Sequence, residues 1–438
     1  MPTRVSNDAR AWHGGDVRSA TPTAAAIDRR QDLDLIRAAV VGGLVFYHTA
    51  LLFPIGFSTS KDPPNLVLTV GVLFAQLWGM PLLFVVAGSG IWHSLGTRSP
   101  GRFARQRLSR LLVPLVTGMV LVVPPQIYYA MKFEGVDPGP YWQFLLRFFD
   151  VRPVARFPAF LQGSGPDPQF HLAHLWFLYY LLVWSLLLLP LFLYLRGPAG
   201  QRLVERVAAR FQGRMGVVLM AVPIAVVEAA LGTWKLGGWN SYSYVVYLLY
   251  GFVLAADRDL REALRRRWAQ SLAIGLGLLP VLLVIASSDL GDPGRMVALD
   301  HDPWSLVWRA LKATAGWSLT VGLIGLAASV IRRPPRRQPS APRPRWASEA
   351  AAGYAREAVL PFYVLHQTPI VILGFYVLRW DSNLPVKFLA ISLGALAVTL
   401  CAYELLVRRT SVTRVLFGMP AKAATWSASP SSSDTSGR

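Results

Sequence analysis

About ten apolar segments of roughly 20 residues run through this chain of 438 residues and restrict what it can fold into. They lie near residues 35–55, 66–94, 111–131, 173–195, 215–233, 241–256, 270–288, 304–331, 357–378 and 384–407. Hydrophobic residues make up 53% of the chain and charged residues 16%, against about a quarter charged in a soluble domain. Inside a bilayer a helix satisfies its own backbone polar groups. The sequence therefore predicts an all-α, polytopic integral membrane protein with about ten transmembrane helices.

The net charge of +20 comes from 44 Lys and Arg residues against 24 Asp and Glu residues. These cations do not gather on one soluble unit, which argues against nucleic acid as a partner. If the N-terminus is cytoplasmic, inner segments carry 32 Lys and Arg residues and outer segments carry 8. This asymmetry predicts a multi-pass protein of a bacterial inner (plasma) membrane, with both termini cytoplasmic and membrane lipids as partners.

The chain is expected to hold one membrane domain with polar segments around and within it. The predicted parts are a disordered tail at 1–30, the membrane domain at 31–420, an outer loop at 132–172, a basic inner linker at 332–356 and a disordered tail at 421–438. Within the outer loop, Tyr141 to Phe149 is expected to form a short amphipathic helix, followed by a flexible cover. The first 28 residues are polar, so we expect no secretory signal peptide.

Arg37 and His48 are ionisable residues in the first apolar segment. Eleven residues of α-helix bring them within about 20° of each other around the axis and roughly 16 Å apart along it. An ionisable residue inside a bilayer is interpreted first as functional, because its burial is costly. His48 is either a general base for a hydroxyl or a hydrogen-bonded residue of the helix bundle. Arg37 is either its partner in catalysis or a positive-inside residue.

Arg107 and Arg110 belong to a basic segment, Ser99 to Pro114, that leads directly into the third apolar segment. Residues three apart on an α-helix face the same way, and two guanidinium groups on one face can bind a phosphate. The alternative is that they only set the orientation of the chain, because each inner segment carries about five cations. The direct run into an apolar helix favours a phosphate site.

His174 and Trp176 stand at the outer start of the fourth apolar segment, next to His171. The spacing of His171 and His174 occurs at metal sites, but no nearby carboxylate or cysteine completes a ligand set, and we predict no metal. The single Cys401 also excludes an intrachain disulfide and a multi-cysteine metal site. Trp176 either anchors the helix at the membrane interface or stacks on a sugar ring. His174 and Trp176 are thus acceptor-binding or structural candidates.

His366 and Glu228 lie deep in the ninth and fifth apolar segments. Each is expected to face a neighbouring helix and to pair there, so each is an acceptor-binding or structural candidate. Glu404 is different, because Arg408 follows one turn later near the cytoplasmic end. We expect these two residues to form a structural ion pair.

Several motifs resemble those of the membrane-bound acyltransferase-3 family. The first span of that family carries an Arg, ten residues and a His, a spacing that Arg37 and His48 match. MPLLFVVAGSGIW (80–92) is similar to the Gly-containing end of the second span, and Arg107 and Arg110 match the Arg-x-x-Arg pair that opens the third. HLWFL, YVLHQTPI and YELLVRRT followed by LFGM resemble the branch that contains glucan succinyltransferases.

The resemblance covers about residues 30 to 420 and implies an O-acyltransferase. Such an enzyme moves an acyl group, acetyl or succinyl, from cytoplasmic acyl-CoA to a hydroxyl of an extracytoplasmic glycan or lipid-linked acceptor. Acyl-CoA is then a co-substrate, and no cofactor is bound permanently. In this interpretation Arg107 and Arg110 hold the phosphates of coenzyme A. Arg37 guides its arm or polarises the carbonyl, and His48 activates the hydroxyl.

One departure from the family concerns the acid that orients His48. Many members carry an acidic pair after the Trp of the fourth span, where this chain has Tyr179 and Tyr180. The alternative function is a secondary transporter or a lipid or glycan flippase, because buried His, Glu and Arg residues also occur in carriers. Inverted repeats and paired broken helices would favour a carrier, and neither is clear in the sequence.

Overall fold

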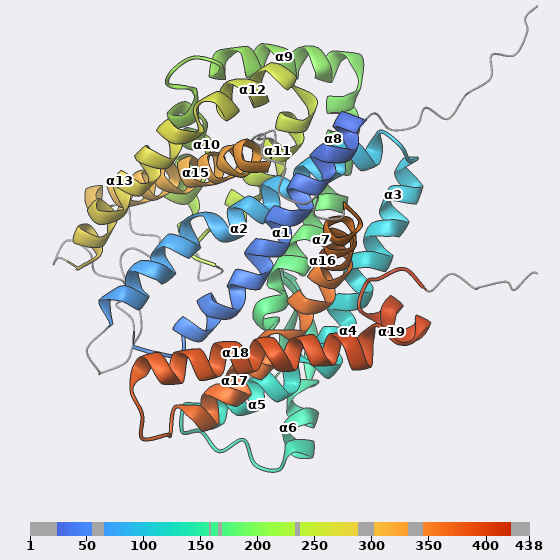
Figure 1. Ribbon diagram of the computed structural model, residues 1–438, viewed down its shortest axis with the longest axis vertical. Helices are drawn as coiled ribbons and strands as arrows, with labels where there is room; N and C mark the ends of the chain where they lie inside the picture. Colours follow the sequence, from blue (N-terminus) through green and yellow to red (C-terminus); the bar gives the residue numbers. More distant parts are fainter. Residues whose placement is uncertain are drawn as a thin grey trace, which may run out of the picture.

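The computed structural model describes residues 24–54, 65–156, 159–164, 169–232, 237–287, 302–331 and 345–421, which form helices and one β-hairpin (Figure 1). The first elements are α1 (Ala24–Ala50), α2 (Leu66–Leu95), α3 (Pro100–Arg107), η1 (Leu108–Leu112), α4 (Val113–Leu121), α5 (Val123–Phe133), α6 (Tyr141–Phe148), β1 (Val151–Arg156), β2 (Ala159–Gly163) and η2 (Ala173–Leu175). The next are α7 (Trp176–Leu187), α8 (Leu189–Arg196), α9 (Pro198–Phe211), α10 (Gly216–Leu231), α11 (Ser243–Ala256), α12 (Arg258–Arg266) and α13 (Trp268–Ser287). The last are α15 (Pro303–Ile331), α16 (Arg345–Leu365), α17 (Gln367–Val377), α18 (Leu384–Ala402), η3 (Tyr403–Val407) and α19 (Ser411–Leu416). Of these, η1 and η3 are π-helices and η2 is a 3₁₀-helix.

Four helices among the described residues are long and apolar enough to cross a membrane, namely α2, α13, α15 and α18 continued by η3. Four bent pairs reach the same length and composition, which gives up to eight spans if each pair is one span. These are α3 to α4 with α5, η2 and α7 with α8, α9 with α10, and α16 with α17. The first and sixth predicted segments correspond to α1 and to the 14-residue α11. The all-α membrane fold is confirmed, whereas the number of ten spans stays a prediction.

Three of these four bends fall beside a proline. Pro124 follows the 45° bend before α5, Pro190 follows the 54° bend before α8, and Pro369 follows the 51° bend before α17. Proline has no backbone N–H to donate, and its ring clashes with the preceding turn, so it bends or breaks a helix. The last of these bends lies at His366, between α16 and α17.

The helices pack as two groups on either side of α1 (Figure 1). The α11 group consists of α2, α10, α11, α13 and α15, and the α17 group consists of α4, α5, α16, α17 and α18. Helix α1 contacts α2 and α15 of the first group and α16, α17 and α18 of the second. Side chains of α1 can therefore meet residues of both groups.

Two glycines bring α2 and α11 close together. A Cβ atom on Gly88 would lie 1.9 Å from the carbonyl oxygen of Leu248, and one on Gly251 would lie 1.9 Å from that of Val85. Small residues at such positions let helix backbones approach in membrane bundles. The α11 group is therefore built on a contact that tolerates no larger residue at either glycine.

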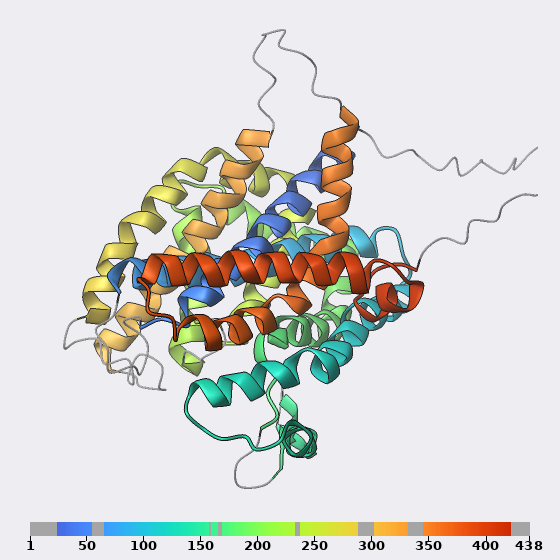
Figure 2. The same ribbon diagram turned by 60° about the horizontal axis from the view of Figure 1, so that its bottom comes forward.

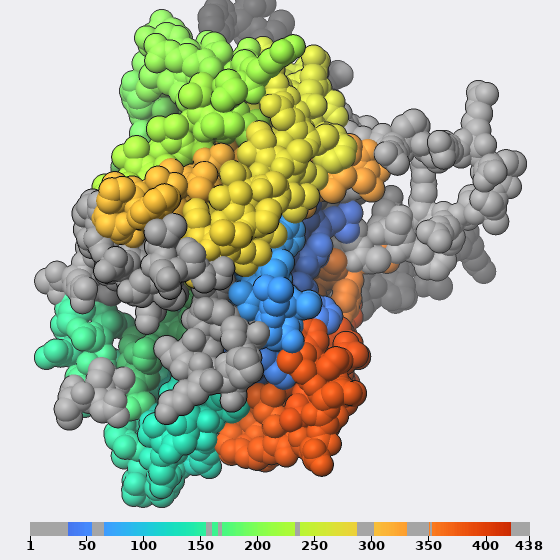
Figure 3. Space-filling model, turned by 90° about the vertical axis from the view of Figure 1, so that its left-hand side faces the viewer, coloured from blue at the N-terminus to red at the C-terminus, as the bar shows by residue number. Residues whose placement is uncertain are grey.

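Helices α13 and α18 form outer faces of the molecule. Only 17% and 22% of their most apolar stretches are buried, against 67% for α2. Figure 3 shows α13 on the surface of the molecule. Figure 2 shows α18 on the side that faces the viewer. Apolar side chains exposed on such faces are what a lipid environment requires.

The predicted outer loop, 132–172, has more structure than we expected. The predicted amphipathic helix is confirmed as α6 (Figure 2). Its Phe144 and Phe148 are fully buried. The flexible cover predicted after it contains β1 and β2, which pair in antiparallel fashion with a shift of register between Pro153 and Arg156, and its flexibility stays a prediction. These strands are short and lack a clear alternation of apolar residues, so the sequence pattern did not predict them.

The predicted tail at 1–30 and linker at 332–356 are shorter than expected. Helix α1 already begins at Ala24, and α16 begins at Arg345. Both starts are rich in Ala, which favours helix. Residues 1–23, 332–344 and 422–438 lie outside the described residues, so the predicted disorder there stays a prediction.

Candidate active site

Three histidines converge between the two helix groups. The ring centroids of His48 and His366 lie 5.4 Å apart, and those of His366 and His174 lie 5.2 Å apart. His48 belongs to α1, His366 to the break between α16 and α17, and His174 to η2. Three candidates from distant parts of the sequence thus meet in one place, which we call the histidine cluster.

His174 is fixed at both ring nitrogens. Its Nε2 lies 2.9 Å from the carbonyl oxygen of Val364, and its Nδ1 lies 3.1 Å from Oε1 of Gln126. A carbonyl oxygen can only accept, so Nε2 carries a proton and donates it. The hydroxyl of Tyr363 donates to the backbone carbonyl of His174 as well. His174, with 6% of its surface exposed, is therefore a buried and fixed member of the cluster.

His366 is fixed at only one nitrogen. Its Nδ1 donates to the carbonyl oxygen of Tyr363, one turn earlier, over 2.8 Å. In a neutral imidazole the other nitrogen, Nε2, is then an acceptor. This Nε2 is buried and has no hydrogen-bond partner among the described residues. A buried acceptor without a partner is unusual in a folded protein and calls for an explanation.

His48 is the most exposed of the three, since the other two are buried. Its ring packs edge-on against Tyr47 at a centroid distance of 5.0 Å, and the Tyr47 hydroxyl accepts a 3.0 Å hydrogen bond from Nε2 of Gln76. Val45 and Thr49 beside it are fully buried. The backbone of α1 is therefore held in place while the imidazole remains partly accessible, as a base that meets a substrate requires.

A group of arginines lies toward the other end of α1. Arg37 pairs with Asp34 at 3.7 Å, and Asp34 pairs with Arg356 of α16 at 2.7 Å. Arg107 lies within electrostatic range of Arg37 and of Arg110. We call Arg37, Arg107 and Arg110 the arginine cluster. Asp34 balances only part of this charge, so the field there favours an anionic ligand.

A π-helix changes how Arg107 and Arg110 are presented. Arg107 ends α3 and Arg110 lies within η1. The i→i+5 hydrogen bonds of a π-helix change the angle between successive residues, so the spacing of three residues no longer has the α-helical geometry that we assumed. Arg107 is half-buried with its guanidinium 4.9 Å from the ring centroid of Phe103, whereas Arg110 is exposed. That both bind one phosphate stays a prediction.

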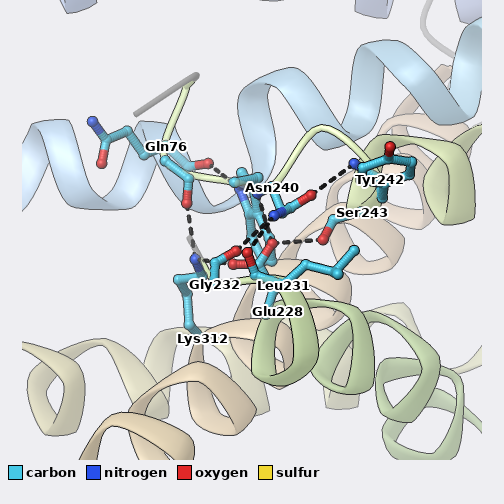
Figure 4. A network of polar contacts seen from close by, with 10 residues as sticks. Gln76, Glu228, Leu231, Gly232, Asn240, Tyr242, Ser243 and Lys312 are labelled. Atoms are coloured by element: carbon cyan, nitrogen blue, oxygen red, sulfur yellow. Dashed lines mark hydrogen bonds and ion pairs between the residues drawn. The ribbon is translucent and has the colours of Figure 1, made fainter. Parts of the chain in front are cut away.

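Glu228 is buried and fully engaged in hydrogen bonds (Figure 4). Its Oε1 accepts from the backbone N–H of Asn240 over 2.8 Å and from the Ser243 hydroxyl over 2.5 Å. Its Oε2 accepts from Nζ of Lys312 over 2.7 Å, and Lys312 also donates to the Gly238 carbonyl over 2.9 Å. We call this the Glu228–Lys312 network. The prediction that Glu228 pairs with a neighbouring helix is confirmed, because Lys312 lies on α15.

Trp176 packs over the loop that closes this network. Its ring lies 5.3 Å from that of Tyr244, and a Cβ on Gly237 would lie 2.9 Å from the Trp176 ring. Gly237 also has a positive φ of 60°, which glycine adopts without strain. Trp176 thus has protein partners on the inside of the bundle, and a role in stacking on a sugar stays a prediction.

His171 and His174 do not form a pair in the structure, whereas Glu404 and Arg408 do. His171 is exposed while His174 is buried, so the two do not face a common site. No group of three or more His, Cys, Asp or Glu among the described residues has the arrangement to hold a metal ion. The expected ion pair of Glu404 and Arg408 is confirmed at 3.2 Å.

Sequence reasoning missed three partners of the candidate residues. Lys312 carried the same signal as Glu228, an ionisable residue inside an apolar segment, and could have been found. Tyr363 and Gln126 carried no such signal, because only the fold brings them to His174.

Comparison with known families identifies the chain. The family model of the acyltransferase-3 type, described as an acyltransferase domain, matches residues 30–404. No curated protein and no solved structure matches the chain. The matched region contains the histidine cluster, the arginine cluster and the Glu228–Lys312 network. The protein is thus a membrane acyltransferase, and the chain belongs to the acyltransferase-3 family.

Proposed function

We propose that this enzyme transfers an acetyl or succinyl group from cytoplasmic acyl-CoA to a hydroxyl of an extracytoplasmic glycan or lipid-linked glycan. It would do so across a bacterial inner membrane, with about ten spans and both termini in the cytoplasm. The observation that supports this proposal is the arrangement along α1, which carries both Arg37 of the arginine cluster and His48 of the histidine cluster. The carrier alternative is set aside because the family is one of acyltransferases.

The arginine cluster suits the phosphate groups of the donor. Guanidinium groups form strong charge-assisted hydrogen bonds to phosphate, and Arg107 and Arg37 lie near enough to act on one ligand. Arg37 is roughly 16 Å along α1 from His48, too far to polarise a carbonyl that reacts there. Of the two roles considered for Arg37, we therefore favour binding the donor at its phosphate end.

The histidine cluster suits the transfer itself. The unprotonated nitrogen of His48 takes the proton from the acceptor hydroxyl while the oxygen attacks the thioester carbonyl. The tetrahedral intermediate then collapses, the carbon–sulfur bond breaks, and the coenzyme A thiolate leaves. The proton on His48 passes to this thiolate, so that an ester and free coenzyme A are formed and His48 is neutral again.

His366 is proposed as the positioning residue for His48. Its Nε2 accepts hydrogen bonds and has no other partner among the described residues, and its ring is the neighbour of the His48 ring. A hydrogen bond from His48 to this nitrogen, direct or through one water, would fix the tautomer of His48 and stabilise its protonated form. His366 would thus do what an acidic residue does in many members of the family.

The proposal predicts that the purified protein binds coenzyme A through the arginine cluster. Changing Arg107 and Arg110 to Gln should weaken binding about tenfold or more, because each charge-assisted contact contributes about 1.5–3 kcal/mol. Isothermal calorimetry on detergent-solubilised protein measures this. The matched control is Arg102→Gln with Arg105→Gln, two exposed arginines one turn earlier. No binding by the wild type in the micromolar to millimolar range, or equal losses in both variants, would contradict the proposal.

The proposed orientation predicts which sites can be labelled from outside. After Cys401→Ser, a cysteine introduced at Ser164 should react with an impermeant thiol reagent added to intact cells. A cysteine at the exposed Ser411 should react only after the cells are opened. The reverse pattern would invert the direction of transfer.

A further inference from the structure

A cavity lies outside the candidate active site, between α1, α2, α11, α12 and α15. The volume of this cavity is about 190 Å³. Its inner walls are apolar and include Val85 of α2, Leu254 of α11, and Val321 and Ile324 of α15. None of the residues of the histidine cluster, the arginine cluster or the Glu228–Lys312 network lines it.

The rim of this cavity is basic. Arg258, Arg261 and Arg265 all line it, and their spacing of three and four residues places them on one face of α12. The neighbouring Leu260 and Leu264 are buried and hold this short helix against the bundle. The arginine face of α12 is therefore fixed at the mouth of the cavity.

The rim keeps a surplus of positive charge. Arg265 donates to both carboxylate oxygens of Glu262 over 2.8 and 2.7 Å, and these bonds lower the pKa of Glu262 to about 2. Arg261 donates to the carbonyl oxygens of Leu254 and Ala255, which end α11. Among the described residues that line the cavity, three are arginines and one, Glu262, is a carboxylate, and Arg258 is exposed.

The cavity is basic at its rim and apolar in its depth, which matches a molecule with a charged head and an apolar chain. The basic residues of α12 stand at the ends of α2, α11 and α15, whereas the apolar walls run between those helices. Basic pockets between membrane helices on the cytoplasmic side are suited to anionic lipid headgroups, and each Lys or Arg near an anionic membrane surface adds to the attraction. The shared chemistry is a phosphate head with an apolar chain.

We propose that this cavity binds one anionic phospholipid of the inner leaflet. The phosphate lies against Arg258, Arg261 and Arg265, and an acyl chain lies between α2, α11 and α15. The site goes beyond the proposed transfer reaction, since it needs neither donor nor acceptor. Ile36, the residue before Arg37, also lines the cavity, so the bound lipid lies beside the part of α1 that carries Arg37.

Native mass spectrometry of the full-length, delipidated protein tests this site with three added probes. Dioleoyl phosphatidylglycerol should be retained about tenfold or more better than dioleoyl phosphatidylcholine, since two or more arginines contribute. Glycerol phosphate alone should bind far more weakly, because it lacks the chain. Equal retention of the two lipids, or binding of glycerol phosphate as strong as that of the anionic lipid, would overturn the proposal.

Two pairs of variants place the binding in the cavity. Arg258→Gln with Arg265→Gln should remove the preference for phosphatidylglycerol, while Arg266→Gln, on the exposed side of the same helix, should keep it. Ala328→Phe should fill the cavity and prevent binding, while Ala327→Phe, which does not line it, should not. Retention of the preference in the first variant of each pair contradicts the site.

A competition experiment separates this site from the proposed donor site. Coenzyme A should not displace phosphatidylglycerol, and the cavity variants should bind coenzyme A as the wild type does in calorimetry. Displacement by coenzyme A would identify the cavity as part of the donor site and overturn the lipid proposal. Failure of the wild type to bind coenzyme A would instead count against the proposed function and leave the lipid result standing.

Discussion

The Glu228–Lys312 network and the histidine cluster both lie among apolar helices, but their hydrogen bonds are arranged differently. In the network, both carboxylate oxygens of Glu228 accept hydrogen bonds, and Lys312 donates to Glu228 and to a carbonyl. In the histidine cluster, Nε2 of His366 is buried without a partner among the described residues. A satisfied buried network rigidifies a fold, whereas an unsatisfied acceptor is available to a substrate or to a neighbouring group.

The two clusters also differ in their place in the bundle. The network joins α10, α11 and α15, which belong to one helix group. The histidine cluster brings together α1, η2 and the bend between α16 and α17, so it lies where the two groups meet. The difference teaches that burial alone does not mark a reactive residue in this protein. An unsatisfied hydrogen-bonding group is a better guide to a candidate functional residue here than burial of the side chain.

The largest effect is expected for His48→Ala. Loss of a general base lowers the rate about 10²- to 10⁴-fold, while the amount and melting temperature of the protein should stay near those of the wild type. Acyl transfer is measured in proteoliposomes with acyl-CoA and by glycan profiling of cells. The control is His171→Ala, which changes an exposed histidine outside the cluster. Normal acyl transfer by a well-folded His48 variant would contradict the proposal that the histidine cluster is catalytic and the Glu228–Lys312 network structural.

Lys312→Met is expected to act on stability. It leaves Glu228, which is 0% exposed, without its ion-pair partner, and breaking a buried pair in this way costs about 3–5 kcal/mol. Adding Glu228→Gln should restore part of the loss, because Gln is neutral and can still accept from Asn240 and Ser243. Thermal unfolding in detergent measures both. A Lys312 variant that melts like the wild type but has lost activity would assign the network to function.

A smaller effect is expected for His366. His366→Ala should lower activity about 10- to 100-fold, as when a residue that orients a reactive histidine is removed. His366→Gln should retain more activity, because its amide oxygen can still accept a hydrogen bond, but its pH–rate profile should change since one titrating group is gone. Equal losses in both variants with an unchanged pH profile would indicate a packing role only.

The sequence was sufficient for the fold class and for part of the site. Apolar segments reflect the bilayer directly, so the helices of the membrane domain could be placed from composition. His48 and Glu228 could be singled out because ionisable residues are rare in such segments. Which of them carries chemistry could not be read in this way, since it depends on partners.

Contacts between distant segments account for what the sequence did not reveal. His48 and His366 lie more than 300 residues apart in the chain, and their neighbourhood depends on how α1 packs against α16 and α17. A hydrogen bond to the carbonyl oxygen of Tyr363 decides which ring nitrogen of His366 carries the proton, and no sequence motif predicts this bond. The α-helical face assumed for Arg107 and Arg110 was interrupted by hydrogen bonding within η1.

The π-helix η1 has a consequence for how this region can vary. A turn closed by i→i+5 hydrogen bonds holds about one residue more than a turn of α-helix. Deleting one residue from η1 would therefore allow this turn to close with i→i+4 bonds, and α3 and its arginines would keep their orientation relative to α4. Deleting one residue from α4 instead would turn α3 by about 100° relative to the part of the helix that contacts α5 and α16.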